Sequence, residues 1–170
     1  MRYIALDFEF GNDTKGSICA YGLAFEDGQK EHGFVRLHAS APKQEHTRFH
    51  GITQEDTDGG VAFSELYNRI GALAQETETV FVAHNLKSDR RAWLAAIALH
   101  ELAPRPLLWL NSIPIAEAEL KAAGEPIRPG IATMAARYGM NISHHNPADD
   151  AAVALEVVLR NPPSLNIVRD

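Results

Sequence analysis

The chain has 170 residues, a formal net charge of −6 and a single cysteine, Cys19. This length fits one domain over residues 1–170, and a single cysteine excludes an intrachain disulfide. The negative charge argues against a protein that coats long nucleic-acid duplexes through a basic surface. The N-terminal apolar run is too short for a signal peptide, and no run approaches the roughly 20 residues that cross a bilayer, so we expect a cytoplasmic protein without membrane contact.

The N-terminal part of the chain is rich in apolar residues and in turn signals. Strands are predicted over residues 3–10, 17–26 and 31–38, with a hairpin turn at Asp27-Gly28. Residues 39–51 include few apolar side chains and a proline, and they are predicted to form a loop. Three consecutive strands joined by short turns indicate an antiparallel meander.

Helices and strands alternate in the rest of the chain. The spacing of apolar residues predicts helices over 61–75, 86–102, 114–123, 131–138 and 149–160 and short buried strands over 79–83 and 107–110. Pro162-Pro163 ends the last helix. A strand meander followed by this alternation predicts an α/β fold with three layers, in which a mixed sheet has antiparallel strands at one edge.

The first strand carries two acidic residues, Asp7 and Glu9, near its end. Residues two apart in a strand share a face, so both carboxylates project in the same direction. Paired oxygen ligands of this kind suit Mg²⁺ or Mn²⁺. Two solvated carboxylates at a strand end are the simpler interpretation of this pair when it is taken alone.

Asn85 and Asp89 follow the strand 79–83, at the point where a helix begins. Strand ends in open α/β sheets are common ligand sites. Both residues also suit a helix start, because asparagine is a preferred cap and acidic residues complement the helix dipole. Lys87, Arg90 and Arg91 lie around Asp89 and could guide phosphates, or they could be exposed charges on a helix face.

The segment His144-His145-Asn146-Pro147-Ala148-Asp149-Asp150 precedes or opens the last helix. A histidine beside an acid can act as a general base or a metal ligand. The simpler interpretation is a polar helix start, with Asn or Asp as the cap and proline in the first turn. His144 is an alternative base to His145, and Asp149 an alternative ligand to Asp150.

Taken in order, these elements form one set: Asp-x-Glu, Asn-x-x-x-Asp and His-x-x-x-x-Asp. This set resembles the DEDDh exonucleases, the family of the DNA polymerase III proofreading subunit, RNase T and oligoribonuclease. Further matches are Ser17-Ile18-Cys19-Ala20-Tyr21-Gly22, the segment Phe49-His50-Gly51-Ile52-Thr53-Gln54-Glu55-Asp56, and Val82-Ala83-His84-Asn85 followed by Asp89. The resemblance extends from about Tyr3 to Leu155.

The resemblance implies an RNase H-like fold with a mixed five-stranded sheet, in a single exonuclease domain. It implies that Asp7, Glu9 and Asp150 bind two divalent cations, Mg²⁺ or Mn²⁺, that Asp89 helps to hold the second, and that His145 is the general base. It also implies a set of substrate contacts, which are Phe8, Phe10, His50, Gly51, Ile52 and Asn85.

Three positions depart from the family pattern. Phe10 stands where the family usually has Thr or Ser, whose contacts help to seat the 3′ end. Ser88 replaces the common aromatic residue before Asp89. Pro147 replaces the common Ala two residues after His145, so the loop that holds the base can differ.

The expected activity is 3′→5′ exonuclease cleavage of DNA or RNA 3′ ends in single strands, with release of nucleoside monophosphates. A homodimer or recruitment by a nucleic-acid-processing complex is compatible with the resemblance. Two alternatives stay open: a non-catalytic nucleic-acid or protein-binding module with the same fold, and a phosphodiesterase that acts on small substrates.

Overall fold

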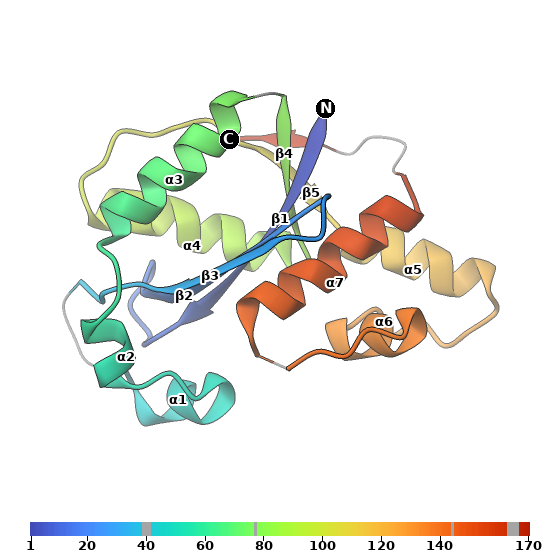
Figure 1. Ribbon diagram of the computed structural model, residues 1–170, viewed down its shortest axis with the longest axis horizontal. Helices are drawn as coiled ribbons and strands as arrows, with labels where there is room; N and C mark the ends of the chain where they lie inside the picture. The colour runs from blue at the N-terminus through green and yellow to red at the C-terminus, as the bar shows by residue number, and fades with distance from the viewer. Residues whose placement is uncertain (39–41, 77, 144, 163–166) are drawn as a thin grey trace.

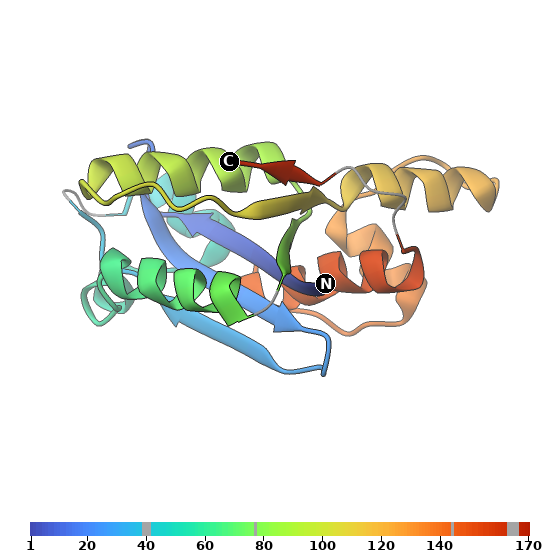
Figure 2. The ribbon, with the colours of Figure 1, turned by 90° about the horizontal axis from the view of Figure 1, so that it is seen from above.

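The computed structural model describes residues 1–38, 42–76, 78–143, 145–162 and 167–170. Within these residues, the strands form one six-stranded sheet in the order β3-β2-β1-β4-β5-β6. They are β1 (Arg2–Phe10), β2 (Ile18–Phe25), β3 (Lys30–Phe34), β4 (Thr79–Ala83), β5 (Leu108–Asn111) and β6 (Val168–Arg169). Figure 2 shows β3 and β6 at opposite edges of this sheet.

The strand directions confirm the predicted mixed sheet with an antiparallel meander. β1 pairs antiparallel with β2, and β2 pairs antiparallel with β3. β1 pairs parallel with β4, and β4 pairs parallel with β5. The expected number of five strands was one too low, because the two-residue β6 pairs antiparallel with β5. Both residues of β6 are exposed, so no apolar pattern marks this strand in the sequence.

The helices, drawn in Figure 1, confirm the five that were predicted, with shifts at their ends. They are α1 (Gln44–His50), α2 (Gln54–Asp58), α3 (Phe63–Glu76), α4 (Leu86–Leu99), α5 (Ile113–Ala122), α6 (Ile131–Tyr138) and α7 (Pro147–Arg160). The loop predicted over 39–51 was wrong for its second half, which forms α1; residues 39–41 lie outside the described residues. None of the residues of α1 is buried, so this helix has no apolar stripe that a sequence could reveal.

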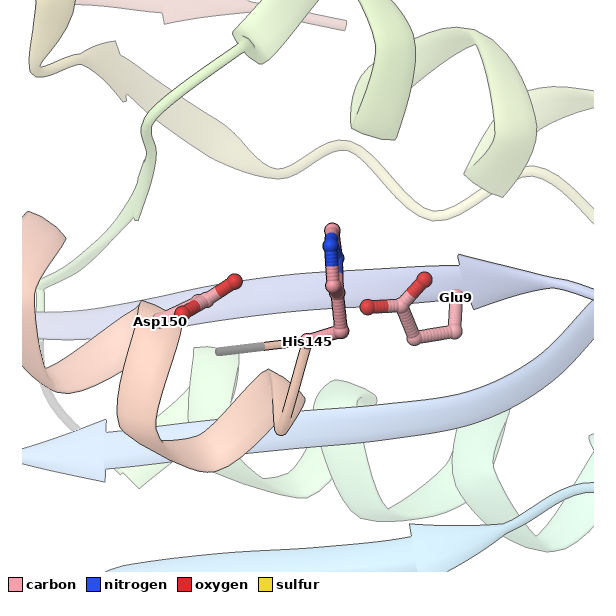
Figure 3. Close-up of side chains that lie close together, drawn as sticks. All are labelled: Glu9, His145 and Asp150. Atoms are coloured by element: carbon pink, nitrogen blue, oxygen red, sulfur yellow. The ribbon is translucent and has the colours of Figure 1, made fainter. Parts of the chain in front are cut away.

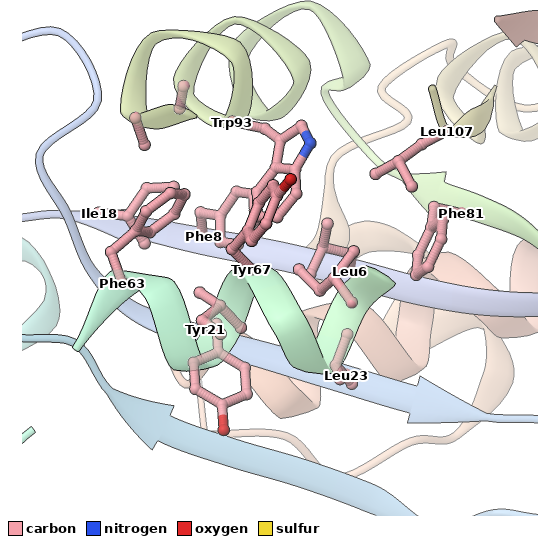
Figure 4. Packing of buried hydrophobic residues seen from close by; sticks show 14 of the residues in the cluster. Leu6, Phe8, Ile18, Tyr21, Leu23, Phe63, Tyr67, Phe81, Trp93 and Leu107 are labelled. Atoms are coloured by element: carbon pink, nitrogen blue, oxygen red, sulfur yellow. The ribbon is translucent and has the colours of Figure 1, made fainter. Parts of the chain in front are cut away.

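The two faces of β1 pack against different helices (Figure 1). Ile4, Leu6 and Phe8 belong to a buried cluster with residues of α3 and α4, and Figure 4 shows Phe8 beside Trp93 in that cluster. Ala5 lies on the other face, in a cluster with residues of α7. Because side chains alternate along a strand, Asp7 and Glu9 project on the same face as Ala5, toward α7.

α7 approaches the sheet closely at Gly22 of β2, which is the residue paired with Asp7. A Cβ atom at Gly22 would lie 2.1 Å from the carbonyl carbon of Pro147. The absence of a side chain at Gly22 therefore lets the start of α7 rest directly on the sheet.

No helix in the described part of the chain has the length and apolar character needed to cross a membrane.

Candidate active site

The C-terminal part of β1 supplies two carboxylates to the candidate site. Asp7 pairs with Gly22 and Glu9 with Ala20, both in regular antiparallel register. The register then shifts between Glu9 and Phe10, which marks a bulge or irregularity directly after the second carboxylate. Such irregularities bend a strand and are common beside active sites.

The loop before α7 and the first turns of that helix supply His145 and Asp150. The side chain of Asn146 caps α7 by accepting hydrogen bonds from the backbone N–H groups of Ala148 (3.0 Å) and Asp149 (3.3 Å), and Pro147 opens the helix. His145 has a left-handed backbone with φ of 65°. This conformation is uncommon for histidine and is held by the surrounding loop.

Three of the predicted residues come together at this point. The ligand atoms of Glu9, His145 and Asp150 all lie within 4.8 Å of one another. In Figure 3 the imidazole of His145 stands between the two carboxylates. Asp150 is buried, whereas Glu9 and His145 are half-buried and accessible from solvent.

Asp149 is directed away from this cluster. One carboxylate oxygen accepts a hydrogen bond from Lys30 Nζ on β3 (2.5 Å), and the other accepts one from the backbone N–H of Ser143 (2.9 Å). The contact with Lys30 helps to keep the pKa of Asp149 below its usual range, against the effect of burial. Asp149 therefore closes the loop that carries His145, while Asp150 points to the cluster. His144, the alternative base, lies outside the described residues.

Asp89 reaches the site from the first turn of α4. Its side chain is buried and accepts a hydrogen bond from the backbone N–H of Phe8 (3.2 Å). This bond ties the start of α4 to β1, between the two acidic residues of that strand. Asn85 stands at the cap position of α4, but its side chain makes no capping hydrogen bond and is exposed. The capping interpretation of Asn85 is therefore wrong for its side chain.

The four carboxylates share a poorly solvated space and act on one another electrostatically. Burial, followed by the charges of Asp89, Glu9 and Asp150, raises the pKa of Asp7 well above its usual range. Burial and the charges of Asp150 and Asp89 raise the pKa of Glu9 to about 7. Burial raises the pKa of Asp89 to about 7, against the opposing effect of its backbone hydrogen bonds. Crowded anions of this kind favour a bound cation.

The donor set fits a divalent metal ion. Carboxylate oxygens are the ligands that Mg²⁺ and Mn²⁺ prefer. Glu9 and Asp150 offer carboxylate oxygens for a cation, and a ring nitrogen of His145 lies within 4.8 Å of both. Asp7 and Asp89 add negative charge beside them, as the raised pKa of Asp7 reflects.

The predicted substrate contacts fall into two groups. His50, Gly51 and Ile52 line a cavity of ≈ 260 Å³ together with His145 and Pro147. Phe10 and Asn85 line a second, larger groove. Phe8 does not fit its predicted role: its side chain is 4% exposed and stacks on Trp93 at 6.2 Å between ring centroids, so only its backbone faces the site.

Sequence reasoning missed Phe49 as a neighbour of the site. Its ring is 72% exposed and lies 6.5 Å from the His145 ring, between centroids. His50 is held next to it by a hydrogen bond between its Nε2 and the backbone oxygen of Phe10 (3.1 Å). The feature that marks Phe49 is the exposure of its apolar side chain, and exposure cannot be read from a sequence.

Comparisons with known proteins bear on the fold. No family model and no curated protein sequence matches the chain. Among solved structures, the nuclease domain of 3′hExo, a DEDDh family member bound to rAMP, is similar with a TM-score of 0.74 and 16% identity over 98% of this chain and 95% of that one. Cell-death related nuclease 4 (CRN-4) gives 0.72 and 16% over 93% of this chain. E. coli exonuclease I in complex with a dA16 oligonucleotide gives 0.71 and 12% over 95%.

The chain spans 62% of the length of CRN-4 and 41% of that of exonuclease I. The identities are low, so these similarities concern the arrangement of the backbone. They extend over 93–98% of this chain. The chain therefore has the RNase H-like fold of the DEDDh 3′-exonucleases, as its motifs predict.

Proposed function

We propose that the protein is a metal-dependent 3′→5′ exonuclease that hydrolyses phosphodiester bonds at the 3′ ends of single-stranded DNA or RNA and releases nucleoside monophosphates. The observation that carries the proposal is the convergence of Glu9, His145 and Asp150 within 4.8 Å. Hydrolysis of a phosphodiester needs an activated water and neutralisation of the leaving oxygen, and a base beside a cation-binding carboxylate cluster meets both needs. The fold similarity to 3′-exonucleases supports the same activity.

The residues that would hold two divalent cations are Asp7, Glu9 and Asp150, with Asp89 helping to hold the second. When bound, Mg²⁺ or Mn²⁺ would acidify the attacking water and offset charge on the leaving 3′ oxygen. The backbone N–H of Phe8 keeps Asp89 oriented toward the site. Burial and the charges of three acidic neighbours raise the pKa of Asp7, and a bound cation would offset their repulsion, which supports a role for Asp7 as a ligand.

In this proposal His145 is the general base. It accepts the proton of the attacking water at a ring nitrogen, in reach of Glu9 and Asp150. The cavity lined by His50, Gly51 and Ile52 opens beside His145 and is suited to the terminal nucleotide. Its lining combines polar and apolar side chains, as is usual for a site that holds a small ligand.

The test compares substrates of different size. Purified protein is incubated with a single-stranded oligonucleotide or with bis(p-nitrophenyl) phosphate, each with Mg²⁺, Mn²⁺ or EDTA. Cation-dependent release of nucleoside monophosphates from the oligonucleotide, at a kcat/KM far above that of the small ester, is the expected result. Hydrolysis of the small ester alone would favour the small-substrate phosphodiesterase, and binding of the oligonucleotide without hydrolysis would favour the non-catalytic module.

A further inference from the structure

We propose that the groove between the β1–β2 loop and α4 binds the sugar–phosphate backbone of a single strand upstream of its 3′ end. This inference rests on the proposed function and names the substrate class more closely: oligonucleotides with several phosphates, in preference to dinucleotides and small esters. We call this feature the basic groove and define it by Phe10, Lys15, Asn85, Lys87 and Arg91 in its lining.

The basic groove has a volume of ≈ 550 Å³, and two of its lining residues lie close in the chain to residues of the candidate active site. Phe10 directly follows Glu9 in the chain, and Asn85 directly precedes the helix that carries Asp89. We therefore infer that a strand whose terminal phosphodiester lies at the carboxylates continues past Phe10 and Asn85 into the groove.

Close packing of backbone segments fixes the shape of the basic groove. Gly16 has φ of 86°, and a Cβ atom at this position would lie 2.5 Å from the backbone nitrogen of Ala96. The β1–β2 loop therefore rests directly on the backbone of α4, and glycine is needed for this contact. Ala92 and Ala95 of α4 add small apolar side chains to the lining. The groove is thus a preformed surface rather than a gap between independent segments.

The charge of the basic groove is opposite to that of the chain as a whole, which is −6. Lys87 and Arg91 are four residues apart on α4 and so share one face of the helix, and Lys15 lies across from them on the loop. In the described part of the chain, none of these three exposed cations forms an ion pair with a carboxylate.

Other charged residues near the basic groove, unlike its three cations, are paired with a residue of opposite charge in the described part of the structure. Arg90, between the two basic residues of α4, is neutralised by the side chain of Asp170 (2.5 Å). Asp13, in the same loop as Lys15, is neutralised by Lys43 and also contacts His46 Nε2 (3.0 Å). The acidic charge of the loop is therefore compensated, while the three cations of the groove are left to attract an anion.

A single strand fits these features better than a duplex. Three cations, one aromatic ring at Phe10 and apolar helix side chains form the combination that binds phosphates and stacked bases without reading sequence. A duplex would need an extended basic surface, which the acidic chain lacks.

The experiment measures binding separately from cleavage. Fluorescence anisotropy in EDTA gives the Kd of 5′-labelled strands of two and eight nucleotides at several salt concentrations. The proteins are the wild type, the double variant Lys87→Ala/Arg91→Ala, and Lys121→Ala, whose exposed lysine lies on α5. The replaced side chains are all exposed, so thermal unfolding is expected to match the wild type and shows that each variant is folded.

The expected result is a loss of about 10-fold to 30-fold in affinity of the double variant for the eight-nucleotide strand, with the salt slope reduced by about 1.4, since each single-strand phosphate contact contributes about 0.7. The dinucleotide and the Lys121→Ala protein should show no comparable loss. An unchanged Kd and slope for the longer strand, or an equal loss for both lengths, would overturn the inference. Binding through the groove without 3′ cleavage would instead refute only the proposed function.

Discussion

Gly22 of β2 lies directly against Pro147 at the start of α7, so closely that a Cβ atom would come within 2.1 Å of the proline carbonyl carbon. Gly22 also pairs with Asp7 across the β1–β2 ladder. This contact therefore sets the distance between the carboxylates of β1 and the helix that carries Asp150. The loop that holds His145 ends at the same point.

Replacing Gly22 with alanine should damage both the fold and the candidate site. The new methyl group would meet backbone atoms, which cannot rotate away, and overpacking of this kind costs about 1–3 kcal/mol. For a chain of this size each kcal/mol lowers Tm by about 2–4 °C. Thermal unfolding measures the first effect, and nuclease activity at a temperature well below Tm measures the second.

Gly59→Ala is the matched control for this substitution. Gly59 has φ of −78°, and its Cβ atom would meet its nearest neighbour at an ordinary 3.5 Å. The control is expected to change Tm little, or to raise it slightly by restricting the unfolded chain. Equal behaviour of the two variants would mean that the contact with Pro147 does not constrain α7.

Asp149 and Asp150 are adjacent but should respond differently to substitution. Asp149→Ala removes the contacts with Lys30 and Ser143 and loosens the loop of His145, so activity should fall by about 10-fold to 100-fold, the cost of a small misplacement. The rise in Tm on addition of Mg²⁺ or Mn²⁺ should persist in Asp149→Ala.

Asp150→Asn should abolish both activity and the metal-induced rise in Tm. A ligand that binds only the folded state stabilises it by about 2.7 kcal/mol when the free ligand concentration is 100 times Kd, and this variant should lose that effect. Loss of the metal-induced rise in Asp149→Ala would make Asp149 a ligand.

His145→Ala tests the assignment of the general base. General-base catalysis contributes about 10²–10⁴-fold, so kcat should fall by that factor while KM stays within a few-fold of the wild type. His38→Ala provides the control, because His38 is exposed and contacts the ring of His100 rather than the carboxylates. A kcat of His145→Ala close to that of the wild type would remove His145 from the chemistry.

His84 should make stability depend on pH. Its Nδ1 lies 2.8 Å from the hydroxyl of Ser112 and its Nε2 lies 2.6 Å from the backbone oxygen of Pro129. Burial lowers the pKa of His84, against the opposing effect of the Pro129 contact, so the unfolded chain binds the proton more readily. The contribution of His84 to the free energy of unfolding should be fully present above the unfolded pKa of about 6.5. Below that pH the contribution should decrease, by at most about 1.4 kcal/mol per pH unit.

Urea unfolding of the wild type and of His84→Gln at pH 7.5 and 5.5 measures this dependence. Burial also lowers the pKa values of His50 and His100, whereas the pKa values of Asp7, Glu9 and Asp89 are raised, so these groups change stability with pH in opposite directions. The difference between the two proteins isolates His84: from pH 7.5 to 5.5 the free energy of unfolding of the wild type should fall relative to that of the variant. The same change in both proteins would show that His84 does not contribute.

The sequence predicted most of the fold because its main elements carry regular apolar patterns. Residues of β4 are all buried, and α3 and α7 bury one face each, so their periods are visible in the sequence. Three elements were missed: α1, the five-residue α2 and β6. α1 buries none of its residues, and β6 has two exposed residues paired at a sheet edge. Tertiary contacts, not local preference, hold these elements in place.

The candidate site was predictable as an ordered set of residue types but not as a set of contacts. Strand alternation placed Asp7 and Glu9 on one face, and proline and asparagine marked the start of α7. Three features required the structure: the close approach of Gly22 to Pro147, the turning of Asp149 toward Lys30, and the burial of Phe8 against Trp93. Each depends on segments far apart in the chain.

The most direct test of metal-dependent 3′-exonuclease activity is digestion of a 5′-labelled single-stranded oligonucleotide, as DNA and as RNA, by the wild type and by Asp7→Asn. With Mg²⁺ or Mn²⁺, the wild type should produce a ladder of labelled products that shortens one nucleotide at a time. EDTA should stop the reaction, and Asp7→Asn should lose nearly all of it while remaining folded. Internal cuts, cleavage that persists in EDTA, or full activity of Asp7→Asn would contradict the proposed function.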